Sequence, residues 1–131
     1  MWKEVVTDGK GRIGAAEIEV ACQAGWIEVV QVTNNPITEL LKRDLDEGEA
    51  EVIALALEHK SDLILLDEAE ARRIAGRYDL AKTGVVGVLI RAKREEKIVS
   101  LREELNNLRN QGNFWMSERL RDQALHVVGE M

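Results

Sequence analysis

Three short apolar stretches, each separated from the next by a helical pattern, are the feature that most limits the folds open to this chain. They predict strands at residues 26–32, 62–67 and 78–82. Strands that alternate with helices form βαβ units, and such units build a parallel sheet with helices on its faces. The sequence therefore predicts a single α/β domain over residues 1–131, with a short parallel sheet flanked by helices.

Helical patterns fill the intervals between the predicted strands. They predict helices at residues 15–24, 36–43, 47–59, 68–77, 85–96, 100–109 and 117–127. Gly25 is expected to end the first helix as a C-terminal cap. Asn35 is expected to cap the second helix, which Pro36 would open.

Length and composition limit the class of protein. The chain has 131 residues, 45% of them hydrophobic, which is enough for one core. Its only cysteine, Cys22, excludes a disulfide within the chain. No apolar run approaches the roughly 18 residues of a membrane span, and no leader pattern marks the N-terminus. These features predict a cytoplasmic protein with no membrane segment.

The distribution of charge is more informative than its total. A formal net charge of −6 argues against nonspecific binding to phosphate backbones. Acidic residues dominate residues 39–70, however, and basic residues dominate residues 71–94. This order fits a metal site beside a phosphate-binding surface, and it also fits two solvated helix faces. On charge alone the second interpretation is the simpler one.

Two groups of carboxylates are candidates for chemistry. Glu49 lies at the start of the helix at 47–59. Asp67 ends the middle strand and Glu68 follows it, at the edge where parallel sheets place functional groups. Crowded carboxylates repel one another, and Mg²⁺ or Mn²⁺ would remove that repulsion and activate a water for attack on a phosphodiester. A purely structural role is also open, because Asp46 with Glu49, and Asp67 with Glu70, both fit a capping box.

Gly84 and Gly87 lie at the junction between the third stretch and the following helix. Two explanations are open: a turn that admits phosphate at the helix N-terminus, or a tight contact between helix and strand. The spacing is too loose for a specific phosphate motif, so the packing contact is favoured.

Taken in order, several segments resemble a known family. They are LDEGEAEVIALA at residues 45–56, LILLDE at 63–68, RRIA at 72–75 and TGVVGVL at 83–89. This ordered set resembles uncharacterised prokaryotic PIN-like proteins that are described as predicted nucleic-acid-binding. The resemblance covers nearly the whole chain and implies a three-layer PIN-like fold.

PIN domains are metal-dependent ribonucleases, many of them toxins of toxin–antitoxin pairs, with a ring of acidic residues around Mg²⁺ or Mn²⁺. The resemblance implies that Glu4, Glu49 and Asp67 are the catalytic acids and metal ligands, with Glu68 as a further ligand. Glu51 is a weaker alternative to Glu49. The basic residues expected to contact the RNA backbone are Arg72, Arg73, Lys82 and Arg91.

The chain also departs from the family pattern. The family usually opens with a strand ending in Asp, ahead of the segment that resembles residues 1–6. We therefore expect an N-terminally truncated PIN-like fold whose metal site lacks one ligand. An open strand edge would invite pairing with a second copy, so we expect a homodimer. Two rivals to the ribonuclease remain: a catalytically impaired module that binds nucleic acid or a protein such as an antitoxin, and a structural oligomer whose acids only cap helices.

Overall fold

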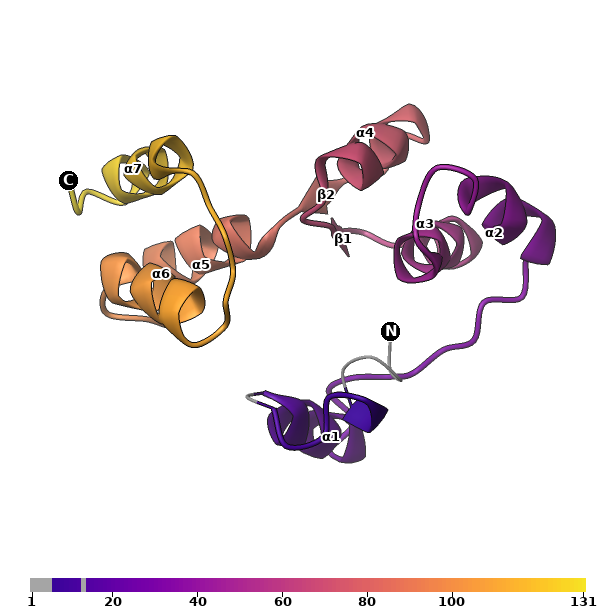
Figure 1. The fold of residues 1–131 in the computed structure, drawn as a ribbon, viewed down its shortest axis with the longest axis horizontal. Helices are drawn as coiled ribbons and strands as arrows, with labels where there is room; N and C mark the ends of the chain where they lie inside the picture. Colours follow the sequence, from indigo (N-terminus) through magenta and orange to yellow (C-terminus); the bar gives the residue numbers. More distant parts are fainter. Residues whose placement is uncertain (1–5, 13) are drawn as a thin grey trace. The chain divides into compact units, whose positions relative to one another are not determined.

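The computed structural model describes residues 6–12 and 14–131 and divides the chain into two compact units, Met1–Ser61 and Asp62–Met131. The first unit holds helices α1 (Ala15–Gln23), α2 (Asn35–Leu41) and α3 (Glu47–His59) (Figure 1). The second unit holds β1 (Ile64–Leu65), α4 (Ala69–Arg77), β2 (Lys82–Thr83), α5 (Val85–Arg94), α6 (Leu101–Asn110) and α7 (Glu118–Val127). The predicted α/β class is confirmed, whereas a single domain over residues 1–131 stays a prediction.

Helix α3 forms with the predicted bounds because its own sequence specifies both ends. The Asp46 side chain accepts the Glu49 amide at 2.8 Å, and Glu49 Oε2 accepts the Asp46 amide at 3.4 Å, so the predicted capping box is present. Ala50, Ile53 and Ala56 are buried on one face of the helix, and α2 packs against α3.

The ends of α1 and α2 test two local predictions. Gly25 has a positive φ of 85°, with its amide bonded to the Cys22 carbonyl and the Trp26 amide bonded to the Ala21 carbonyl. This is the expected glycine cap in its Schellman form. The predicted cap of α2 was wrong by one residue, because the side chain of Asn34, not Asn35, accepts the Ile37 amide at 3.3 Å.

The predicted strand at 26–32 was wrong. These residues form no strand, and apolar side chains there stand in solvent, with Trp26 87% and Val29 55% exposed. A strand needs a partner for its backbone groups, and no other described segment supplies one. The segment is held at its two ends: the Trp26 amide donates to the Ala21 carbonyl of α1, and the Glu58 carboxylate of α3 accepts the amides of Thr33 and Asn34.

The predicted parallel pairing is confirmed, although both strands are short. Ile64 pairs with Lys82 and Leu65 with Thr83, and the Leu66 amide donates to the Thr83 carbonyl at 2.9 Å. Ile64 and Leu66 are buried while Leu65 is 59% exposed, so only one face of the strand is covered. Helix α4 contacts β2 and buries Ala71, Ile74 and Ala75.

The main apolar core of the second unit lies among α5, α6 and α7, which contact one another. Its buried members are Val86, Leu101, Leu105, Met116, Ala124 and Leu125. The Ser100 and Ser117 side chains cap α6 and α7. Among the described residues, no helix is long and apolar enough to cross a membrane.

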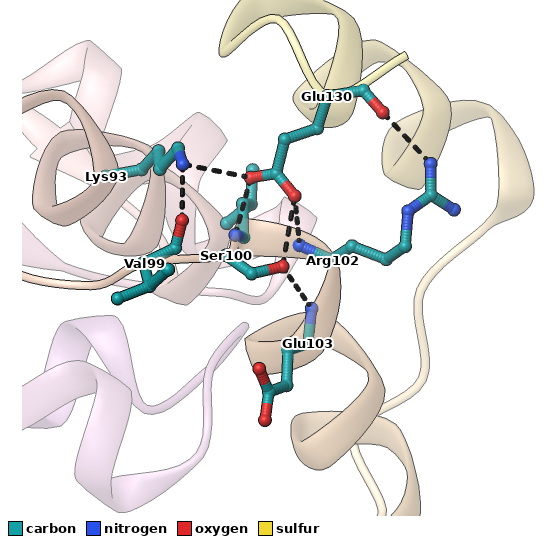
Figure 2. Close-up of polar contacts among 7 residues, drawn as sticks. Lys93, Val99, Ser100, Arg102, Glu103 and Glu130 are labelled. Atoms are coloured by element: carbon teal, nitrogen blue, oxygen red, sulfur yellow. Dashed lines mark hydrogen bonds and ion pairs between the residues drawn. The ribbon is translucent and has the colours of Figure 1, made fainter.

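The C-terminal residues close this three-helix group. After α7 ends, the Glu130 carboxylate reaches the first turn of α6, where it lies between Lys93 of α5 and Ser100 (Figure 2). It accepts the amides of Leu101 at 2.6 Å and Arg102 at 3.1 Å, and the Ser100 hydroxyl at 3.1 Å. One carboxylate thus ties together the end of the chain, the start of α6 and the last turn of α5.

Candidate functional site at the carboxyl edge of the parallel strands

Asp67 lies where the sequence places it, just past the carboxyl end of β1, and its side chain is exposed. Its Oδ1 accepts the amide of Val85, the first residue of α5, at 2.9 Å. That amide would otherwise lack an intrahelical partner, and a negative charge is favourable at a helix N-terminus. The hydrogen bond holds the carboxylate beside the end of β2, on the same edge of the strand pair.

The capping box that the sequence left open for Asp67 and Glu70 does not form. Helix α4 begins at Ala69 with Glu68 at its cap position, and no side chain caps it. Glu70 instead pairs with Arg73 one turn along α4. The hydrogen bond from Arg73 lowers the pKa of the Glu70 carboxyl. Asp67 is therefore not a local cap of its own helix, and it serves a helix that begins 18 residues later.

The two glycines after β2 make close contacts, as the packing interpretation expected. A Cβ at Gly84 would lie 2.6 Å from Asp67 Oδ1, and one at Gly87 would lie 2.2 Å from Thr83 Oγ1. Both distances are shorter than real Cβ contacts allow. The start of α5 thus packs against the strand ends without room for side chains, which brings its first amide within reach of Asp67.

Glu49, the acid predicted to open the middle helix, is half-buried and belongs to the capping box of α3. The helix-capping role that the sequence left open for Glu49 is therefore confirmed, and the capping hydrogen bond uses its Oε2. Glu68 is exposed next to Asp67. Glu4 lies outside the described residues. Glu49 belongs to the first unit and Asp67 to the second, so their separation depends on how the two units meet.

Replacing Asp46 by alanine is expected to lower the free energy of unfolding by about 1 kcal/mol, because α3 loses the side chain that accepts the Glu49 amide. Urea denaturation followed by circular dichroism measures this. Glu49→Gln is the matched variant: glutamine also serves at the third position of a capping box, so stability should change less. A larger loss for Glu49→Gln than for Asp46→Ala would contradict this account of the helix end.

Within the described part of the chain, no three or more His, Cys, Asp or Glu side chains come together as a group that could hold a metal ion. The predicted ligand set includes Glu4, which that part does not contain, and it draws on both units. The set of Glu4, Glu49, Asp67 and Glu68 therefore stays a prediction.

The four basic residues predicted to contact RNA all belong to the second unit but differ in their surroundings. Arg73 pairs with Glu70, and Arg91 pairs with Glu95 at 2.6 Å, each on its own helix. Arg72 is exposed and Lys82 half-buried, and neither forms an ion pair with another described residue. Of these four, Arg72 and Lys82 are therefore the two whose charge no described acid neutralises through an ion pair.

Two features of this edge were not predicted from the sequence: the hydrogen bond from the Val85 amide to Asp67, and the steric reason for a glycine at residue 84. One feature of the sequence does point to the first of them. Gly84 occupies the cap position of α5 and has no side chain with which to cap it. A helix whose cap residue supplies no acceptor can take one from elsewhere in the chain, and an unassigned acid after a parallel strand is a natural source.

The fold and the site together define a class of protein. It is an α/β protein with an exposed acidic residue fixed at the carboxyl edge of parallel strands. A family model described as a PIN domain matches residues 1–130. Because the match covers nearly the whole chain, the chain belongs to the PIN domain family, as the resemblance indicated. Membership indicates a nuclease-type module. No curated protein and no solved structure matches the chain significantly.

Proposed function

We propose that this chain is a metal-dependent ribonuclease that hydrolyses RNA phosphodiesters. The observation that carries the proposal is the Asp67 carboxylate, which stays exposed while an amide of α5 holds it at the carboxyl edge of the strands. Parallel α/β sheets place their functional groups at this edge. Membership in the PIN domain family supports the same chemistry.

The donors at this edge suit a hard divalent cation. Asp67 and Glu68 offer exposed carboxylate oxygens, which Mg²⁺ and Mn²⁺ prefer as ligands. Glu4 and Glu49 are the further ligands that the sequence predicts. Such a cation, when bound, supplies a water of lowered pKa as the nucleophile. The second oxygen of Asp67 is the one available to a ligand, since Oδ1 already accepts the Val85 amide.

Basic residues of the same unit would position the substrate. Lys82 belongs to β2 itself, and Arg72 lies on α4, which contacts β2. Cations of this kind neutralise backbone phosphates and fix the orientation of a nucleic acid without reading its sequence. Arg73 and Arg91 would have to leave their glutamate partners to do the same.

The test is hydrolysis of a single-stranded RNA with Mn²⁺ by the wild type and by Asp67→Asn. Asparagine keeps an oxygen that can accept the Val85 amide, so we expect the variant to fold and to lose the Mn²⁺-dependent hydrolysis. Asp62→Asn is the matched control, because Asp62 is also an exposed acid and lies before the amino end of β1. Its activity should equal that of the wild type.

Equal activity of Asp67→Asn and the wild type would contradict the proposal. The alternative function is a catalytically impaired PIN-like module that binds nucleic acid or a protein such as an antitoxin. Calorimetric titration separates the two, because the alternative predicts no binding of Mn²⁺ at millimolar concentration. The homodimer expected from the sequence stays a prediction. The molecular mass of the protein in solution would show whether it is a monomer or a dimer.

A further inference from the structure

We infer that Gly84 is a positioning residue for Asp67: the missing side chain at Gly84 is what lets the carboxylate lie against the first amide of α5. The catalytic consequence of this inference rests on the function proposed above, but the positioning itself does not. It concerns three groups in one unit, namely the Asp67 carboxylate, the Gly84 Cα and the Val85 amide.

The backbone conformation of Gly84 does not itself require glycine. Its φ of −116° and ψ of −176° are extended values that any residue can adopt. The reason for glycine must therefore lie in the surroundings. The nearest atom to a built Cβ is Asp67 Oδ1 at 2.6 Å, followed by Asp67 Cγ and the Leu66 carbonyl oxygen, both at 3.5 Å. Only the contact with the carboxylate oxygen is impossible.

The same oxygen that excludes a side chain at Gly84 accepts the Val85 amide at 2.9 Å. Asp67 has a short side chain whose carboxylate cannot withdraw from residue 84 and still reach the next amide along the backbone. An alanine at 84 should therefore displace the carboxylate and break this hydrogen bond. The start of α5 has little freedom to move away instead, because Thr83, directly before Gly84, is held in the strand pair by the hydrogen bond from the Leu66 amide to its carbonyl.

The experiment records the position of the Val85 amide signal by ¹H–¹⁵N NMR in the metal-free protein. We expect Gly84→Ala to move the amide-proton resonance upfield, toward the position expected for Asp67→Ala, which removes the acceptor altogether. Gly76→Ala is the matched control: a Cβ there meets only the flexible end of Lys82, at 3.4 Å from Nζ, so the signal should stay in place. With Mn²⁺ and single-stranded RNA, Gly84→Ala should also lose turnover while its circular dichroism remains that of the wild type.

A Val85 signal that Gly84→Ala leaves in its wild-type position would overturn the inference. If Gly84→Ala does not fold, the double variant Asp67→Ala/Gly84→Ala decides, because it lacks the carboxylate that excludes the side chain. Folding of the double variant supports the inference, and failure to fold refutes it. A wild type without Mn²⁺-dependent hydrolysis would defeat the proposed function alone, since the NMR comparison needs no activity.

Discussion

Replacing Leu125 by alanine is expected to lower the free energy of unfolding by about 3 kcal/mol. Leu125 lies on α7 with none of its surface exposed, in the core that α7 shares with α5 and α6. The substitution removes buried apolar surface and leaves a cavity that the three packed helices can fill only in part. Of the changes considered, this one should weaken the second unit most.

Urea denaturation measures the effect, and Leu120→Ala is its matched control. Leu120 belongs to the same helix and undergoes the same chemical change, but it is 41% exposed. Its loss should therefore be less than half as large, because little apolar surface returns to water and no closed cavity forms. Similar losses for the two variants would mean that α7 does not pack on α5 and α6 as the structure shows.

Replacing Glu130 by alanine is expected to lower the free energy of unfolding by about 2 kcal/mol, a large effect for a residue next to the end of the chain. Its carboxylate accepts two amides of the first turn of α6 and the Ser100 hydroxyl, and it lies 3.8 Å from Lys93 Nζ (Figure 2). Leu101 is fully buried, so its amide would lose its acceptor where water reaches it poorly.

Glu103→Gln is the matched control for Glu130. Glu103 is also a glutamate in the first turn of α6, but it is exposed, and the hydrogen bond at this residue runs from its backbone amide to Ser100 Oγ. Removing its charge affects only the favourable interaction with the helix N-terminus, worth less than about 1 kcal/mol. If Glu130→Ala lowered the free energy of unfolding no more than Glu103→Gln does, the contacts of the Glu130 carboxylate with α6 would contribute nothing to stability.

The stabilisation that the Glu130 carboxylate supplies should also depend on pH. Burial raises the pKa of this carboxyl, but the amides of Arg102 and Leu101, the Ser100 hydroxyl and the Lys93 charge together hold it below its ordinary value of 4.5. A depressed folded-state pKa means that the stabilisation is fully present above pH 4.5 and is lost as the pH falls through the folded-state value. The stability difference between the wild type and Glu130→Gln should therefore shrink on acidification; a constant difference would contradict this.

Predictions that depended on neighbours in sequence succeeded. The bounds of α3, its capping box and the glycine cap after α1 all follow from contacts between residues no more than five apart. Such contacts form wherever the helix forms, so the sequence can specify them without knowledge of the rest of the fold. The cap of α2 was predicted one residue too late because Asn34 and Asn35 are chemically equal candidates.

Two expectations that needed a partner distant in sequence were not met. Residues 26–32 have the composition of a strand, but composition does not provide the neighbour that a strand must pair with. Asp67 was recognised as an important acid from its place after β1. The capping-box alternative placed its hydrogen-bond partner on α4, because the Val85 amide becomes a neighbour only when β1 and β2 pair.

The sequence by itself determined the α/β class, most of the helices, the parallel pairing of two strands and membership in the PIN domain family. Tertiary structure alone decided that Asp67 binds the start of α5, that Gly84 must be small and that Glu130 ties the chain end to α6. The physical reason is the range of the interactions. Periodicity and capping act within a few residues, whereas hydrogen bonds and steric exclusion across 17 to 30 residues exist only after the chain has folded.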